Sequence, residues 1–202
     1  ILIHMPMQPV SAVKIEDGGL HLGMSAAQVN DRVNTAKNIV RDAIGMNNHM
    51  GSAATADPQL MTYLMTALQE KHLFFLDSRT IGKSVAGKIA KEQGVRSLDR
   101  HIFLDDSNEF ADVQRQFKAA IHYARKHGSA IAIGHPRANT IAVLQAGLNN
   151  LPEDIQLVGM GNLWRNEKVI PPKPFILLFS EMPAPTSIEP FEPVGLLRGI
   201  PK

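Results

Sequence analysis

The chain has 202 residues, of which 44% are hydrophobic and 20% charged, a balance typical of a globular domain with a buried core. The net charge is +2, from 21 basic and 19 acidic residues, so the composition excludes the strongly basic surface of a nucleic-acid-binding domain. Cysteine is absent and no apolar run is long enough to cross a bilayer, which excludes disulfides, thiol chemistry and a membrane-spanning helix.

The hydrophobic pattern predicts strands and helices in regular alternation. Short continuous apolar runs predict buried strands, and apolar side chains repeated every three or four residues predict the helices between them. Ser25 and Gln28 form a capping box, which begins the first helix. Strands are predicted at 1–3, 43–46, 73–76, 101–104, 130–133 and 155–158, and helices at 25–40, from 55 or 57 to 68, 84–92, 109–127 and 140–148.

This repetition predicts an α/β fold with parallel strands and outer helices, arranged as a sheet or a barrel. Because an apolar strand stands at residue 1, we expect the chain to be a fragment or processed form that lacks its first strand units. One edge of the sheet would then be exposed. Eight of the 13 prolines lie between Pro171 and the end. Residues 1–165 are therefore predicted to be the folded domain, and 166–202 a proline-rich extended tail.

Polar side chains suited to metal or acid–base chemistry follow five of the predicted strands. They are His4, Asn47-Asn48-His49, Asp77-Ser78-Arg79, Asp105-Asp106 and His135. Because active sites of parallel folds are built at the carboxyl ends of the strands, we expect His4, His49, Asp77 and His135 on one rim. Each also has a structural reading, in which the histidines are ordinary hydrogen-bonded residues and Asp77 caps a turn. Asp105 and Asp106 are assigned to capping of the helix at 109.

Imidazole and carboxylate side chains, without thiols, are the usual ligand set for zinc or a similar divalent ion. Such an ion makes hydroxide available at neutral pH, while remaining acidic and imidazole groups orient water and protonate a leaving group. The pattern therefore indicates a metal-dependent hydrolase.

The strings IHMPMQP, GMNNHMGS, FFLDSRT, IFLDDS and GSAIAIGHP occur in this order along residues 1 to about 160. Together they resemble the divergent polysaccharide deacetylases, a distant branch of the NodB-type carbohydrate deacetylases. The resemblance implies a distorted (β/α) barrel, here without its first strand units, and a divalent metal, with zinc expected. It also implies an acetylated cell-envelope glycan as substrate. The implied location is the periplasm or cell envelope, with the export signal outside this chain.

The metal motif of the superfamily, His-x-x-x-His, matches this sequence only in part. His4 occupies its first position, but Gln8 stands at the second. We expect His49, from the neighbouring strand, to replace the lost ligand. The aspartate pair that supplies the base and a further ligand in the superfamily has no counterpart in these residues.

The resemblance also assigns catalytic and substrate-binding roles. His135 matches the catalytic histidine, and Asp77 matches the aspartate that tunes it. Arg79 is expected to pair with Asp77 or to contact the substrate, and Asn48 is assigned to substrate binding as well.

Two other functions fit the same residues. The loss of a ligand at Gln8 favours a non-catalytic glycan-binding or scaffold protein that keeps the fold, although the aromatic content of 5% argues against tight sugar binding. A peptide amidase with the same metal is the third reading, because the sequence does not distinguish an acetamide from another amide. The sequence makes no prediction of oligomeric state.

Overall fold

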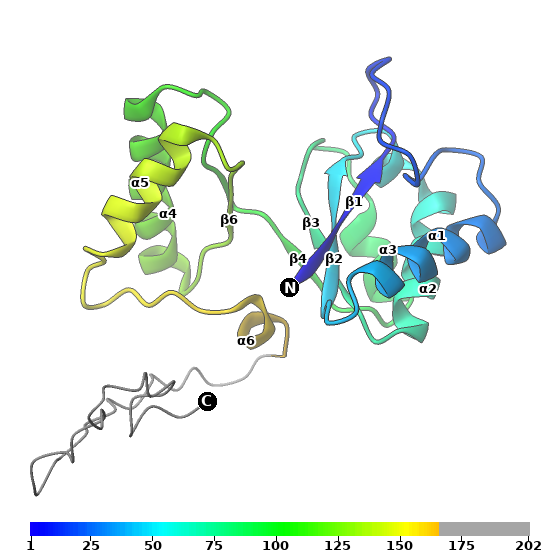
Figure 1. The fold of residues 1–202 in the computed structure, drawn as a ribbon. Helices are drawn as coiled ribbons and strands as arrows, with labels where there is room; N and C mark the ends of the chain where they lie inside the picture. Colours follow the sequence, from blue (N-terminus) through cyan, green and yellow to red (C-terminus); the bar gives the residue numbers. More distant parts are fainter. Residues whose placement is uncertain (166–202) are drawn as a thin grey trace, which may run out of the picture. The chain divides into compact units, whose positions relative to one another are not determined.

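The computed structural model describes residues 1–165, and the predicted tail at 166–202 lies outside the described residues (Figure 1). Strands and helices alternate along most of this region. In chain order they are β1 (Leu2–Met7), α1 (Ala26–Ile39), β2 (Gly45–Met50), the short 3-10 helix η1 (Ala54–Ala56), α2 (Pro58–Glu70), β3 (Phe74–Asp77), α3 (Ala86–Glu92), β4 (Ser97–Asp99), β5 (Ile102–Phe103), α4 (Phe110–His127), β6 (Ala132–Ile133), α5 (Ala138–Leu148) and α6 (Met160–Arg165).

All strand pairs between these elements are parallel. One sheet has four strands in the order β1-β2-β3-β4, and the other pairs β5 with β6. The predicted α/β fold with parallel strands and outer helices is therefore confirmed. Across residues 1–165 the strands form two sheets, and the barrel is not closed. No helix in this part of the chain is long and apolar enough to cross a bilayer.

The main apolar core lies between one face of the four-stranded sheet and helices α1, α2 and α3 (Figure 1). Side chains of a strand point alternately to its two faces, so every second residue of β1 enters this core. The strands contribute Ile3, Met5, Met7, Met46 and Phe75, and the helices contribute Val29, Val33, Leu60, Leu64, Leu68 and Ala90.

The helix ends follow the signals in the sequence. The Ser25 hydroxyl accepts a hydrogen bond from the Gln28 amide, and the Gln28 side chain accepts one from the Ser25 amide, so the predicted capping box is confirmed. The Asp57 carboxylate accepts from the Leu60 amide at 2.7 Å and begins α2. Gly128, with a φ of +84°, ends α4 in the left-handed conformation.

We call the opposite face of the four-stranded sheet the inner face. A second apolar cluster of Phe74, Leu76 and Ile131 lies there, and Leu2 packs against it. Because side chains alternate, His4 lies on the same face as Leu2, nearer the carboxyl end of β1. The inner face is therefore apolar at the amino ends of its strands and polar at their carboxyl ends.

Strands β1 and β2 extend further than predicted, so His4 and His49 lie within strands and not after them. Pro6 is tolerated in β1 because this strand is at the edge of the sheet, where a missing N–H breaks no ladder. The outer side of β1 is covered there by the loop before α1, whose Leu20 amide donates to the Pro6 carbonyl at 2.9 Å.

Two strand predictions were wrong. Residues 155–158 are irregular, and helix α6 follows them without having been predicted. The predicted strand at 101–104 is reduced to β5, while a separate strand, β4, comes before it at Ser97–Asp99.

Candidate functional site

Two imidazoles meet on the inner face. Nε2 of His4 lies 3.1 Å from Nδ1 of His49, and the rings are edge to face, with centroids 4.9 Å apart. The register explains the meeting, because His4 in β1 pairs with Asn47 in β2, and His49 is the next residue of β2 on that face. Two nitrogens bound to one tetrahedral zinc, each at about 2.0–2.1 Å, would be about 3.3 Å apart. The observed 3.1 Å is the length of a hydrogen bond between the rings, and it is also close to the separation that a shared divalent ion would require.

A buried network determines which nitrogen of His4 carries the proton. The Ser78 hydroxyl donates to the Asn48 carbonyl at 2.8 Å, so it accepts from the Asn47 side-chain amide at 3.1 Å. The Asn47 amide oxygen is thereby turned toward Nδ1 of His4, also at 3.1 Å. Since an amide oxygen only accepts, Nδ1 of His4 must donate. Nε2 of His4 then keeps a lone pair, which faces His49.

The surroundings of His4 favour its neutral form. Burial is the main cause that lowers the pKa of His4, and the neighbouring imidazoles of His49 and His135 lower it further, against the opposing effects of the Asn47 hydrogen bond and Glu16. Metal ligation requires neutral imidazole, so this environment suits a ligand.

His135 is held by the carboxylate of Asp105 beyond the end of β6. Nδ1 of His135 lies 3.0 Å from Oδ1 of Asp105, and the His135 backbone amide donates to Oδ2 at 2.7 Å. The Thr140 hydroxyl donates to the same Oδ2 at 2.9 Å. The Asp105 side chain is fully buried, whereas the His135 side chain is 44% exposed. This arrangement fixes the ring through Nδ1 and leaves Nε2 as the free nitrogen.

The Asp105 carboxylate is ionised at neutral pH. Burial alone would raise the pKa of Asp105, but hydrogen bonds from His135 and Thr140 outweigh burial and hold the pKa below its usual range. An ionised carboxylate can only accept, so Nδ1 of His135 is the donor in their contact.

The Asp77 side chain does not contact His135. Asp77 comes two residues after Phe75 in β3, so the two side chains point to the same face of the sheet. Phe75 packs in the core on the helix side, and Asp77 therefore points away from the inner face. Its carboxylate accepts from the Arg79 amide at 2.7 Å and from the Ser84 hydroxyl at 2.6 Å. The prediction that Asp77 tunes His135 is therefore corrected: the structure pairs His135 with Asp105, and Asp77 orders the loop after β3.

Asp105 was assigned to helix capping from the sequence. In the structure the first residue before α4 is Glu109, whose backbone amide donates to the Ser107 hydroxyl at 3.2 Å. Asp105 therefore binds His135 and does not cap helix α4. Its position directly after a short strand, as for the other candidates, was the only sequence signal that pointed to it.

The two residues assigned to substrate binding differ in accessibility. Asn48 is buried, and its side chain accepts from the Ser78 amide at 2.8 Å and donates to the Met50 carbonyl at 2.7 Å. These hydrogen bonds show that the Asn48 side chain stabilises the neighbouring loops. It is buried and does not face a substrate. Arg79 is 41% exposed, and its guanidinium lies 3.6 Å from the Asp99 carboxylate. Its contact with substrate stays a prediction.

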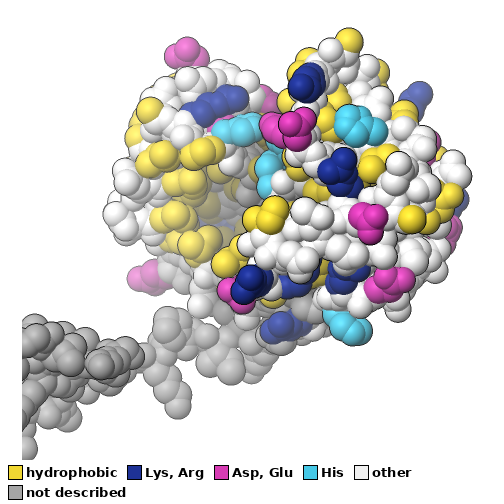
Figure 2. All heavy atoms as spheres, turned by 45° about the vertical axis from the view of Figure 1, so that its right-hand side comes forward, with side chains coloured by type: hydrophobic (Ala, Val, Ile, Leu, Met, Phe, Trp, Pro, Cys, Tyr) yellow, Lys and Arg dark blue, Asp and Glu magenta, His cyan; other side chains and the backbone are white. Residues whose placement is uncertain are grey.

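Within residues 1–165, no three histidine, aspartate or glutamate side chains are arranged to enclose a cation by themselves. His4 and His49 can fill two coordination positions, and the donor type suits zinc. Figure 2 shows histidine side chains close together on one face, with acidic and basic side chains beside them. One acidic neighbour that the sequence analysis missed is Glu16, 3.6 Å from Nε2 of His49.

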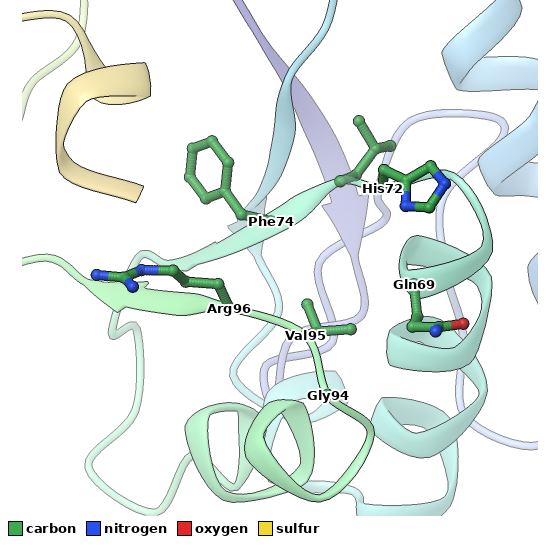
Figure 3. Close-up of a pocket in the computed structure, with 7 residues that line it drawn as sticks. Gln69, His72, Phe74, Gly94, Val95 and Arg96 are labelled. Atoms are coloured by element: carbon green, nitrogen blue, oxygen red, sulfur yellow. The ribbon is translucent and has the colours of Figure 1, made fainter. Parts of the chain in front are cut away.

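A cavity of about 260 Å³ lies elsewhere, at the start of β3 (Figure 3). Its lining includes His72, Phe74, Val95 and Arg96. These residues stand at the amino ends of the strands, the end opposite to the histidine pair. Since catalytic groups of parallel α/β folds gather at the carboxyl ends, we place the candidate site at His4, His49 and His135. A second cavity of about 260 Å³ includes His4 in its lining.

The chain is similar to two uncharacterized bacterial proteins. The chain is 98% identical over 202 residues to an uncharacterized protein of Haemophilus influenzae, covering 100% of this chain and 72% of that protein. It is 44% identical over 176 residues to the uncharacterized protein YibQ of Escherichia coli, covering 86% of this chain and 55% of YibQ. The chain therefore spans little more than half of YibQ.

A crystal structure of an uncharacterized protein from Agrobacterium tumefaciens C58 has the same fold. The TM-score is 0.67 at 22% identity, and the match covers 72% of this chain and 60% of that one. The family model for divergent polysaccharide deacetylases matches residues 1–164. The chain therefore belongs to the divergent polysaccharide deacetylase family.

Proposed function

We propose that the protein is a metal-dependent hydrolase that removes acetyl groups from a cell-envelope carbohydrate. The observation that supports it most is the approach of Nε2 of His4 to Nδ1 of His49, at 3.1 Å. Membership of the polysaccharide deacetylase family supports a carbohydrate substrate. The same proposal places the protein in the periplasm or cell envelope, as the family resemblance implies.

His4 and His49 would hold the divalent ion, with zinc as the ion that two imidazoles suit best. When bound, such an ion polarises a carbonyl oxygen and activates water at neutral pH. The part played by the chain is to bring both imidazole nitrogens to one point and to fix the tautomer of His4. Asn47 does this for His4 by accepting the proton of Nδ1.

His135 would act as the general acid. Its free Nε2 can give a proton to the sugar nitrogen or oxygen that leaves when the acetyl group is released. The Asp105 carboxylate, at 3.0 Å from Nδ1, holds the ring in the orientation that leaves Nε2 available. The exposure of His135 allows a glycan to approach it.

One observation favours the alternative, a glycan-binding or scaffold protein without catalysis. Gln8, at the position of the missing histidine ligand, accepts a hydrogen bond from the Leu22 amide at 2.9 Å. The Gln8 side chain therefore stabilises the loop between β1 and α1 and is not placed as a metal ligand.

Acetate release separates the two functions. The full-length protein, loaded with zinc, is incubated with an N-acetylated or O-acetylated envelope glycan, and acetate is measured enzymatically. The proposal expects acetate release that falls at least about 100-fold in His135→Ala, the range that general acid catalysis contributes. Glycan binding without acetate release, unchanged in His135→Ala, would instead support the scaffold.

A further inference from the structure

We infer that Arg100 is a specificity-determining residue that binds a carboxylate of the glycan, so that the substrate is an acidic carbohydrate. The inference rests on the proposed function for the carbohydrate nature of the substrate, but it does not depend on a bound metal. Arg100 directly follows β4, and its guanidinium carbon lies over the Phe103 ring, 5.0 Å from the ring centroid. The Phe103 and His135 rings have centroids 5.5 Å apart. Phe103 is therefore a common neighbour of the guanidinium and of the proposed acid.

Two backbone carbonyls hold the guanidinium of Arg100 in place. Its Nε donates to the Ser78 carbonyl at 2.6 Å, and its Nη2 donates to the Arg79 carbonyl at 3.0 Å. Both carbonyls belong to the turn after β3, in which Arg79 has a left-handed φ of +52°. Such a φ is uncommon outside glycine, and the Asp77 carboxylate supports it by accepting from the Arg79 amide at 2.7 Å. The position of the guanidinium is therefore set by backbone that is itself held in place.

The other N–H groups of this guanidinium are free to bind a ligand. The two carbonyls occupy the edge formed by Nε and Nη2. Within residues 1–165, the N–H groups of Nη1 and the second N–H of Nη2 have no acceptor, and Arg100 has no ion pair. Together Nη1 and Nη2 form a planar fork, the geometry that matches the two oxygens of a carboxylate.

The carboxylates around Arg100 do not neutralise it by direct contact. Burial is the main cause that lowers the pKa of Arg100, Asp106 and Asp77 raise it, and arginine stays protonated at physiological pH. Asp77 is bonded within the turn after β3, and Asp99 pairs with Arg79 at 3.6 Å. Asp106 is exposed, and in the described part of the chain it forms no ion pair with Arg100. Arg100 thus keeps a positive charge that a ligand carboxylate can pair with.

The position of Phe103 indicates how Arg100 and His135 would divide their roles. A carboxylate on the Nη1–Nη2 fork would be bound beside the Phe103 ring, next to the acetyl group that reacts at His135. Arg100 would therefore select the glycan and would take no part in proton transfer.

Binding of an acidic glycan and of its neutral counterpart separates this role from a structural one. Loss of a charge-assisted hydrogen bond at this half-buried position should weaken binding of an acidic glycan about 10-fold. Lysine keeps the charge but not the planar fork, so Arg100→Lys should show an intermediate loss. If Arg100 only stabilised the turn after β3, its replacement would weaken binding of both glycans equally.

The test measures glycan affinity of the full-length protein by titration calorimetry. One acidic probe is the disaccharide of N-acetylglucosamine and N-acetylmuramic acid, which carries its carboxylate on a lactyl ether. The other is a hyaluronan tetrasaccharide, which carries carboxylates on its sugar rings. Each probe is compared with the same oligosaccharide after reduction of the carboxylates to alcohols. The probe that binds more tightly than its reduced form identifies the source of the carboxylate.

We expect a preference of about 10-fold for one acidic probe over its reduced form, abolished in Arg100→Gln and partly kept in Arg100→Lys. The matched control is Arg96→Gln. Arg96 also donates to a backbone carbonyl, that of Leu163 at 3.4 Å, but it lines the cavity at the amino ends of the strands (Figure 3). Equal affinity for both acidic probes and their reduced forms, or the same preference in Arg100→Gln and Arg96→Gln, would overturn the inference.

Acetate release shows whether this inference or the proposed function has failed. Acetate release without any preference for an acidic glycan would remove the role of Arg100 and leave the deacetylase intact. A preference that Arg100→Gln abolishes, in a protein that releases no acetate, would support Arg100 as the carboxylate-binding residue of a non-catalytic glycan-binding protein.

Discussion

Asp105 binds His135 at two points, through the backbone amide at 2.7 Å and the ring Nδ1 at 3.0 Å. The carboxylate is buried and also accepts from the Thr140 hydroxyl, so it has little freedom to move. This contact fixes both the position and the tautomer of His135, the histidine that we propose as the acid.

We therefore expect Asp105→Asn to lower the rate of acetate release by roughly 100-fold or more, because an amide can hold the wrong tautomer of His135. Glycan binding should change much less than the rate, since His135 would remain in place. Steady-state kinetics of the zinc-loaded, full-length protein measure both quantities. Asp106→Asn, at the exposed neighbouring residue, is the matched control and should keep full activity. Equal rates in the two variants would rule out the positioning role.

Asp105 also predicts a specific acid sensitivity. Its pKa is lower in the folded protein than the ordinary value of 3.8, so the unfolded chain takes up the proton first as the pH falls. The stabilisation from its ionised form is thus complete above the ordinary pKa and is lost as the pH drops below it. Urea unfolding as a function of pH should show Asp105→Asn least stable relative to the unmodified protein near neutral pH. The difference should shrink below about pH 4. A pH-independent difference would contradict this.

Asn47 offers a separate test of the metal site. Asn47→Ala removes the acceptor for Nδ1 of His4 and leaves the histidine free to adopt the other tautomer. We expect zinc affinity to fall about 10- to 100-fold. Asn149→Ala, in an exposed position after α5, should leave affinity unchanged. Chelator competition that shows no difference between these variants would mean that the tautomer of His4 is not important for binding.

Asp77 should matter for stability rather than for catalysis. Its carboxylate is buried and bonded to the Arg79 amide and the Ser84 hydroxyl. Asp77→Ala leaves both donors without this partner, and we expect the free energy of unfolding to fall by about 1–3 kcal/mol. The pH dependence of acetate release should stay that of the unmodified protein. A shifted pH profile in Asp77→Ala would restore Asp77 as the partner of His135.

The sequence alone predicts some of these site contacts and not others. The meeting of His4 and His49 follows from a general property, since parallel neighbouring strands bring their carboxyl ends together. The sequence does not decide whether Asp77 or Asp105 is the partner of His135. Side chains alternate along a strand, so a shift of one residue turns a side chain to the opposite face of the sheet. The exact end of β3 decides where Asp77 points, and no local pattern marks that end.

The shortest elements were also the hardest to predict. Strands β5 and β6 have two residues each, so their apolar runs resemble any buried segment. Residues 155–158 carry a similar run, but no neighbouring strand pairs with them in the described region. Glu16 could not be found from its sequence context either, because its position depends on how the long loop folds back along β1.

The central claim is that one divalent ion is shared by His4 and His49. Zinc stoichiometry of the full-length protein, measured by titration calorimetry and elemental analysis, tests it most directly. We predict one tightly bound zinc per chain, lost in His4→Ala and in His49→Ala but retained in His21→Ala, which removes an exposed imidazole from the neighbouring loop. Absence of zinc from the unmodified protein, or full zinc content in either of the first two variants, would contradict the account.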